Sequence, residues 1–240
     1  AGVRKEIDRH GWPDGITPLT LDVADNASVK AALEAARPHF SGTTFHLVNN
    51  AGIAVGGPVE TTPFARWEEQ INVNLLGVVR ATQAFLPQVR ATKGRVVNIS
   101  SVSGLVASPY LSPYSSSKFA VESLSDSLRR EMRPFGVRVV VVVPAPIATP
   151  IWEKGLGGQG AELRDPAHAD YKIYLESFER MVQASAKSAI PVERTSEAIF
   201  RALTHPNPKA RYVVGNLALR LQMKILPHLP ARWVDWLIAQ

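Results

Sequence analysis

The sequence predicts one α/β domain over residues 1–240, in which a doubly wound parallel sheet lies between two layers of helices. Three observations support this fold class. Apolar segments of strand length alternate with longer segments of helical periodicity along the chain. Residues 137–143 are apolar at every position but one, which is typical of a strand buried on both faces. No repeat, low-complexity tract or linker divides the chain.

The expected elements alternate in type along the chain. Residues 1–4 are typical of the end of a strand, and further strands are expected at 16–23, 44–49, 95–99, 137–143 and 210–214. Helices are expected at residues 26–40, with Asn26 as the N-cap, and at 63–90, 112–133 and 195–204. Strands that are joined through helices run parallel, so the sheet is expected to be parallel throughout.

Composition excludes several classes of protein. With 45% apolar and 20% charged residues, the chain is not of a disordered, collagenous or coiled-coil type. It has no cysteine, which excludes disulfides and thiolate metal sites and fits a reducing, cytoplasmic location. The six histidines lack metal-binding spacing, so no metal is expected. No segment has the roughly 20 apolar residues of a membrane span, and the first residues do not predict a secretory signal.

The net charge of +6 is concentrated near the C-terminus. From residue 186 onward there are eight basic and three acidic residues, an excess of five positive charges. These basic residues stand singly among bulky apolar ones, whereas nucleic-acid-binding segments cluster lysine and arginine. We therefore expect no nucleic-acid partner.

The strongest chemical signal lies between residues 98 and 118. Tyr114 and Lys118 are four residues apart at the start of a predicted helix, so their side chains share one face. A nearby ammonium favours the phenolate and would lower the tyrosine pKa from its ordinary value of about 10. Ser101 follows the carboxyl end of a predicted strand, where open α/β sheets bind ligands. A proton-exchanging phenol, an amine that tunes it and a hydroxyl that holds a carbonyl oxygen can therefore converge.

This arrangement resembles the short-chain dehydrogenase/reductase family, whose members carry a serine, a tyrosine thirteen residues later and a lysine four further on. That spacing matches Ser101, rather than Ser100 or Ser103, together with Tyr114 and Lys118. Further matches follow in family order: Asp22 and Val23 at the adenine; Asn50, Ala51 and Gly52 in a turn at the cofactor; Asn74, rather than Asn72, as a catalytic residue; and Pro144, Ile147 and Thr149 at the nicotinamide. The resemblance implies a Rossmann-type fold and extends to about residue 214.

The resemblance also implies a role for each catalytic residue. Tyr114 would be the general acid/base, and Ser101 would polarise the substrate oxygen. Lys118 would lower the pKa of the tyrosine and hold the nicotinamide ribose, and Asn74 would hold a water that completes the proton relay. The hydride would pass between the nicotinamide and the carbon that bears the oxygen.

Three features bear on the cofactor. Arg4 follows Val3, which stands where the family often has an acidic residue, and this favours NADP over NAD. A plain surface charge for Arg4 and a turn role for Asp22 remain alternatives. No glycine-rich phosphate-binding turn precedes Asp22, so we expect that one strand, in the middle of the sheet, and one helix are missing from the sequence given. Ala145 stands where the family usually has glycine.

The substrate side is expected in an insertion at residues 150–191. An apolar stripe at helical spacing would pack on the core or form the lid of an apolar pocket, with glycines at 155–160 as its hinge. The stripe consists of Tyr171, Tyr174, Phe178, Met181 and Val182. The tail at residues 217–240 mixes basic and apolar residues, which indicates peripheral membrane contact. Folding back over the pocket or onto a neighbouring subunit is the alternative.

The sequence therefore predicts an oxidoreductase that transfers a hydride between NADP(H) and a hydrophobic secondary alcohol or ketone, resembling retinol-type and hydroxysteroid-type dehydrogenases. Two alternatives remain, a 3-ketoacyl-thioester reductase and a non-catalytic binding protein on the same NAD(P)-binding fold. Family analogy implies a homodimer or homotetramer, paired through the long helices at residues 63–90 and 112–133.

Overall fold

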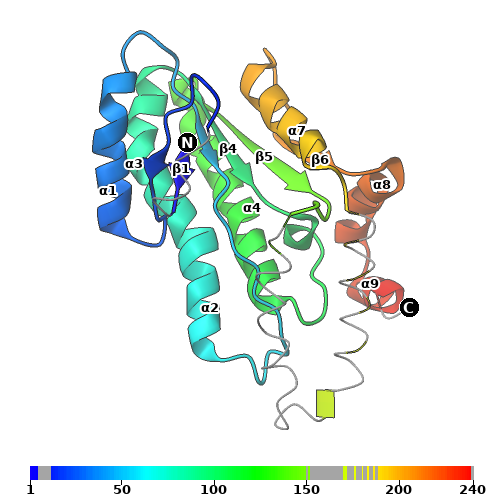
Figure 1. The fold of residues 1–240 in the computed structure, drawn as a ribbon. Helices are drawn as coiled ribbons and strands as arrows, with labels where there is room; N and C mark the ends of the chain where they lie inside the picture. The colour runs from blue at the N-terminus through cyan, green and yellow to red at the C-terminus, as the bar shows by residue number, and fades with distance from the viewer. Residues whose placement is uncertain are drawn as a thin grey trace.

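The computed structural model describes residues 1–4, 12–149, 151, 170, 171, 176, 180, 183, 186 and 189–238. Its strands form two parallel sheets (Figure 1). In the smaller sheet β1 (Gly2–Val3) pairs with β2 (Leu19–Thr20). In the larger sheet the order is β3 (Leu47–Asn49), β4 (Arg95–Ile99), β5 (Arg138–Pro144) and β6 (Arg211–Val214). The predicted parallel α/β architecture is confirmed. The strands were expected in a single sheet, but they form two, with β1 and β2 in one and β3 to β6 in the other.

Helices cover both faces of the larger sheet, which gives the predicted three layers. On one face lie α3 (Gly77–Ala91) and α4 (Ser112–Met132), and on the other lies α7 (Val192–Thr204), whereas α1 (Asn26–Ala36) packs against α3 and against β2 of the smaller sheet (Figure 1). The alternating side chains of β5 show this directly. Val139 packs in a cluster with residues of α3 and α4, whereas Val140 packs with residues of α7. The prediction that this strand is buried on both faces is confirmed.

The predicted helix at residues 63–90 contains a local irregularity. It consists of α2 (Phe64–Ile71), a π-helical turn η3 (Asn72–Leu76) and α3. A π-turn inserts one extra residue into the helical ladder and is often found at functional sites. Here the π-turn contains the candidate catalytic residue Asn74. The periodicity of the apolar positions could not indicate this turn.

Two local expectations at the start of the chain are wrong. The N-cap of α1 is Asp25, whose carboxylate accepts hydrogen bonds from the backbone amides of Ala27 and Ser28, and Asn26 is already helical. The strand expected at residues 16–23 is only the two-residue β2, because its single paired neighbour, β1, is equally short. The Leu19 and Leu21 amides donate to the carbonyls of Ala1 and Val3, and beyond them the Ile16 and Asp25 amides bond within local turns.

The remaining described elements complete the molecule. Short 3-10 turns follow α1, β4, α4 and α8: η2 (Arg37–His39), η4 (Val102–Gly104), η5 (Arg133–Phe135) and η7 (Leu226–His228). After β6, the tail forms α8 (Leu217–Ile225) and α9 (Ala231–Ile238) beside the end of the sheet (Figure 1). None of the described helices has the length and apolarity needed to cross a membrane.

Candidate active site

The carboxyl ends of β3, β4 and β5 lie at one edge of the larger sheet, and the predicted catalytic residues gather there. Ser101 follows β4, and its hydroxyl oxygen caps η4 by accepting from the Ser103 amide at 3.2 Å. Tyr114 lies in the first turn of α4, is only 5% exposed, and its phenol is hydrogen-bonded to Ser101. The structure therefore brings together the hydroxyl and the phenol from two different elements.

Lys118 lies one turn further along α4 and is buried. Its Nζ donates to the Ile99 carbonyl oxygen at 2.9 Å and lies 5.7 Å from the centre of the Tyr114 ring. An ammonium at this distance interacts favourably with the face of the ring. Because the carbonyl is at the end of β4, this hydrogen bond ties the lysine to the same sheet edge that carries Ser101.

The electrostatics of the pair differ from the expectation. Burial raises the pKa of Tyr114 above its ordinary value, and the hydrogen bond with Ser101 only partly opposes this. Burial also lowers the pKa of Lys118 to about 8, while the charge of Glu122 acts to raise it. Removal from water disfavours both the phenolate and the ammonium. The predicted lowering of the tyrosine pKa by the lysine is therefore not seen in the protein alone, where the phenol stays protonated.

Asn74 lies in the π-turn, and its side chain is buried. Its Oδ1 accepts from the Ile53 backbone amide at 2.9 Å, and its Nδ2 donates to the Ile53 carbonyl at 3.0 Å and to the Ser117 hydroxyl at 3.1 Å. Gln70, one turn earlier, holds the same loop through Val55 and also reaches Ser117. The asparagine thus braces the loop after β3 against α4. Its expected role in a water relay stays a prediction.

Sequence reasoning missed Gln70 and Ser117, because neither matches a catalytic residue type in the family pattern. It also missed a second network beneath the site. Asn49 of β3 donates to Thr82 at 3.1 Å and to Asn98 of β4 at 2.8 Å, and Asn98 donates to Ser125 of α4 at 2.8 Å. Polar residues inside apolar strands were the available signal. Buried amides of this kind are stable only when their partners are present, so they fix the ends of β3 and β4 relative to α4.

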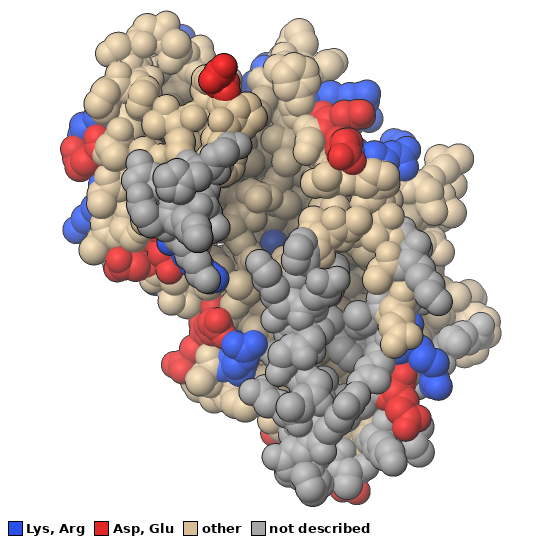
Figure 2. All heavy atoms as spheres, viewed as in Figure 1, with Lys and Arg blue, Asp and Glu red and all other residues tan. Residues whose placement is uncertain are grey.

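The backbone of the turn after β3 closely approaches the catalytic groups. A side-chain carbon added to Gly52 would lie 3.4 Å from the Asn74 Oδ1 and 3.8 Å from the Lys118 Nζ. Asn50 and Ala51, which precede it, are exposed. Figure 2 shows a hollow in this face of the molecule with a basic side chain visible on its floor. Because Lys118 has one donated hydrogen bond among the described residues and an ammonium has three donors, this part of the site fits the hydroxyl groups of a dinucleotide ribose.

The residues predicted at the adenine end lie further along the sheet edge. Asp22 is a turn residue in the structure, since its Oδ1 accepts from the Ala24 amide at 2.9 Å and its own amide donates to Ser28. Val23 packs closely against Gly77 at the start of α3. Arg4 is exposed directly after β1. Arg4 is therefore accessible to a cofactor, and Asp22 is half-buried. The hydrogen bonds that Asp22 makes are those of a turn residue.

The residues predicted at the nicotinamide follow β5. Pro144 is the buried last residue of this strand, and Ile147 forms a parallel bridge with Ile190. Thr149 is half-buried, and its amide donates to the Ile147 carbonyl at 2.8 Å. This bridge joins described residues from before and after the predicted insertion. Ala145, in place of the expected glycine, is buried and its amide donates to Val214.

Most of the predicted substrate-side insertion lies outside the described residues. This holds for Tyr174, Phe178, Met181, Val182 and the glycine segment at 155–160. Of the apolar stripe only Tyr171 is described, and its hydroxyl donates to the carboxylate of Glu60.

Comparison with known proteins identifies the family to which this site belongs. The family described as short chain dehydrogenase matches residues 1–157, well over half of the chain. The chain therefore belongs to the short chain dehydrogenase family and is an NAD(P)-dependent oxidoreductase that acts on CH–OH groups.

Individual relatives and a solved structure are similar along most of the chain. The NADPH-dependent 3-dehydrocapnine reductase of Ornithobacterium rhinotracheale is 35% identical over 94% of this chain and 82% of its own. The 17-beta-hydroxysteroid dehydrogenase type 1 of Homo sapiens is 36% identical over 83% of this chain and 60% of its own. A short-chain dehydrogenase structure from Streptomyces avermitilis superposes with a TM-score of 0.74 at 28% identity, over 98% of this chain and 85% of that one.

Proposed function

We propose that this protein transfers a hydride between NADP(H) and a hydrophobic secondary alcohol or ketone, with Tyr114 as the general acid/base. The observation that carries the proposal is the hydrogen bond between Tyr114 and Ser101 beside a buried Lys118, at the carboxyl edge of a parallel sheet. Ligands of open α/β sheets bind at this edge.

The geometry supports a defined division of labour. The raised pKa keeps the Tyr114 phenol protonated at neutral pH, which is the form that donates a proton. In reduction its O–H bond breaks and the proton goes to the carbonyl oxygen, which takes the electron pair of the C=O bond. The Ser101 hydroxyl, already on the phenol, would hold this same oxygen. A bound dinucleotide would supply the hydride to the carbonyl carbon, so the ketone would be reduced while the dinucleotide is oxidised. Lys118 and the turn at Gly52 would hold its ribose.

Replacement of the phenol tests the proposed function. Tyr114→Phe removes the proposed proton donor but keeps the ring that packs beneath Lys118. Turnover should fall by at least about 10²-fold, while binding of NADPH, followed by its fluorescence, should be nearly unchanged. Measurable turnover in wild type also separates an enzyme from a non-catalytic binding protein. Equal turnover of the variant and wild type would contradict the assigned role.

The choice of NADP over NAD rests on Arg4. Its exposed position directly after β1 suits an ion pair with the additional phosphate of NADP. The name of the bacterial 3-dehydrocapnine reductase, NADPH-dependent, supports the same choice. Arg4→Ala should weaken NADPH binding about tenfold or more and leave NADH binding unchanged, as one lost charge-assisted contact implies. Equal affinities of wild type for the two cofactors would show that the preference is absent.

The hydrophobic substrate class is tested by a panel of compounds. The name of the human relative, a 17-beta-hydroxysteroid dehydrogenase, supports an apolar alcohol or ketone. Steroids, retinoids and long-chain ketones should be turned over with higher kcat/KM than 3-ketoacyl thioesters. A preference for the thioesters would support the alternative of a ketoacyl reductase, and activity confined to short polar hydroxy acids would contradict both.

The tail is proposed as a peripheral membrane contact. Several of its large apolar side chains are exposed by about half or more, and basic residues on the same two helices, α8 and α9, are exposed as well. The apolar ones are Leu217, Leu221, Ile225, Trp233 and Trp236, and the basic ones are Arg220, Lys224 and Arg232. Apolar anchors among cations suit an anionic lipid surface.

Vesicle sedimentation tests this contact. Binding to vesicles that contain phosphatidylserine, with a blue shift of tryptophan fluorescence, is expected, and it should be lost in the Trp233→Ser, Trp236→Ser double variant. Light scattering of the protein without lipid addresses the other occupant of this face, a second copy of the chain in a dimer or tetramer. If wild type forms an oligomer that the double variant does not form, and wild type does not bind vesicles, the tail contacts another subunit and not a membrane.

Cell fractionation would test the proposed cytoplasmic location.

A further inference from the structure

A buried carboxylate that the proposed mechanism does not use lies one helical turn beyond Lys118. Glu122 is four residues after the lysine on α4, so the two side chains are neighbours on one face of the helix. Glu122 is 7% exposed, yet its only hydrogen-bonding partner among the described residues is Arg211 of β6. A carboxylate placed so deeply needs a compensating function or contact.

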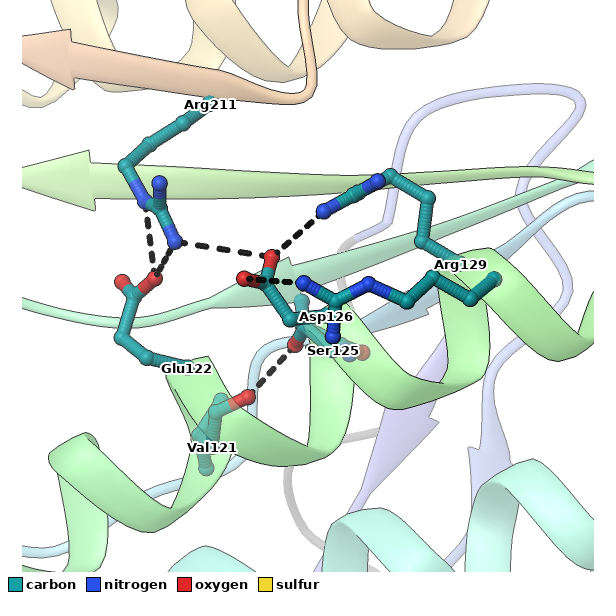
Figure 3. A network of polar contacts seen from close by, with 8 residues as sticks. Val121, Glu122, Ser125, Asp126, Arg129 and Arg211 are labelled. Atoms are coloured by element: carbon teal, nitrogen blue, oxygen red, sulfur yellow. Dashed lines mark hydrogen bonds and ion pairs between the residues drawn. The ribbon is translucent and has the colours of Figure 1, made fainter.

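The two carboxylate oxygens of Glu122 have different surroundings. Oε2 accepts from the Arg211 Nε at 2.8 Å and from its Nη2 at 2.6 Å (Figure 3). Oε1 is buried and has no hydrogen-bond partner in the described part of the chain. A structural clamp alone would use both oxygens, in the two-pronged geometry that arginine and carboxylate prefer. The Arg211 contact is therefore one-sided, and the Oε1 side of the charged group faces other parts of its buried surroundings.

Lys118 is the group on which this charge acts. Apart from Glu122, its described surroundings are uncharged: the Ile99 carbonyl of β4, Asn74 of the π-turn, the Gly52 turn and the titratable but protonated Tyr114. The charged groups around Glu122 itself are Arg211 and, further along α4, Asp126, which lies 3.7 Å from Arg211 and also pairs with Arg129 and Arg130. The negative charge of Glu122 thus stabilises the lysine ammonium in a site whose burial opposes it.

We propose that Glu122 is a positioning residue for the active site, which keeps Lys118 protonated while Arg211 holds the Glu122 carboxylate in place. The consequence for catalysis rests on the proposed function, since the charged lysine would hold the cofactor and serve the tyrosine. The electrostatic coupling itself does not, because it exists in the protein without cofactor. Glu122 on α4 and Arg211 on β6 are 89 positions apart in sequence, and their ion pair connects β6 to the catalytic lysine.

The coupling is measured directly by nuclear magnetic resonance of the full chain with carbon-13 at the lysine Cε. The resonance that Lys118→Met lacks belongs to Lys118, and its titration midpoint should lie at about 8 in wild type. In Glu122→Gln the midpoint should move to lower pH by roughly one pH unit, at the low end of the roughly 1–3 units that an adjacent opposite charge produces. The protonated fraction at pH 8 would then fall from about half to about a tenth.

Two further variants separate this role from simple packing. Asp126→Asn also removes a carboxylate that contacts Arg211, but it lies two turns from Lys118 and should leave the lysine midpoint unchanged. Arg211→Gln removes the positive charge that offsets Glu122, so the midpoint should move to higher pH, opposite to Glu122→Gln. If Glu122→Gln does not fold, this upward shift still tests the proposal. An unchanged midpoint in the folded Glu122→Gln or Arg211→Gln variant would overturn it.

The same variants connect the coupling to catalysis. The alkaline fall in kcat/KM for reduction should begin at lower pH in Glu122→Gln than in wild type, while Asp126→Asn should keep the wild-type profile. If wild type shows no turnover, the proposed function fails, but the titration midpoints still decide the role of Glu122. A shifted midpoint with an unshifted activity profile would overturn the catalytic consequence and retain only the coupling.

Discussion

Replacement of Lys118 by methionine should make the protein more stable at neutral pH, although it removes a residue of the active site. The lysine is buried, and its pKa of about 8 lies below its ordinary value of 10.5. The unfolded chain therefore binds this proton more tightly than the folded protein between those two values. Stability that depends on this group rises as the pH increases from about 8 to 10.5, and is lowest below pH 8.

The size of the effect follows from these two values. One pKa unit corresponds to about 1.36 kcal/mol, so the difference between 10.5 and about 8 destabilises wild type by about 3 kcal/mol at pH 7. Methionine has a similar length and no charge, so it removes this cost. It also removes the hydrogen bond to the Ile99 carbonyl, which costs about 1 kcal/mol. Lys118→Met should therefore be about 2 kcal/mol more stable than wild type at pH 7 and about 1 kcal/mol less stable above pH 10.5.

Urea denaturation of both proteins between about pH 7 and pH 10.5 measures this difference. Lys30→Met is the matched control, because Lys30 is an exposed lysine on α1. The difference between Lys118→Met and wild type should shrink and change sign as the pH rises, whereas the control should show no such reversal. A difference that stays constant with pH would refute the reasoning that burial of an ammonium limits the stability of this site.

Three further perturbations have defined outcomes. Gly94→Ala would place a carbon 1.8 Å from the backbone carbonyl of Phe45, so the free energy of unfolding in urea should fall by about 2–3 kcal/mol or more; an unchanged value would mean that this close approach is absent. Asn98→Ala would remove two buried hydrogen bonds, with Asn49 and with Ser125, and should lower the free energy of unfolding by about 2–4 kcal/mol, with a thermal midpoint equal to wild type as the contrary result. Gly52→Ala should weaken NADPH binding with little change in thermal stability, because the added carbon would lie at ordinary contact distance, 3.4 Å from the Asn74 Oδ1 and 3.8 Å from the Lys118 Nζ, on the side where the cofactor is proposed to bind. A loss of stability with normal binding would contradict this.

The pH dependence of the two reaction directions supplies a fourth test. Because the pKa of Tyr114 lies above its ordinary value, oxidation, which needs the phenolate, should become faster as the pH rises through the alkaline range. Reduction needs the protonated phenol and should fall over the same range. Initial rates in both directions measure this, and an oxidation rate that peaks below neutral pH would contradict the raised pKa.

The sequence by itself determined the fold class and the chemical type of the site. Alternation of apolar strand segments with helical segments was sufficient for the three layers, because each pattern depends on local periodicity. The four-residue spacing of Tyr114 and Lys118 set their common helix face, and the position of Ser101 after a strand placed it at the correct sheet edge. Local errors occurred where tertiary pairing decides the outcome, as in the short β2 and the division of the sheet.

Only the tertiary structure decided the environment of those residues. The sign of the shift in the Tyr114 pKa depends on burial, which a nearby lysine in the sequence does not reveal. The π-turn at Asn74 and its contact with Ser117 bring together segments 43 residues apart. The pairing of Glu122 with Arg211 depends on the register of β6 against β5, because that register sets the position of the arginine along α4. Such contacts join residues far apart in sequence, so local periodicity and spacing contain no information about them.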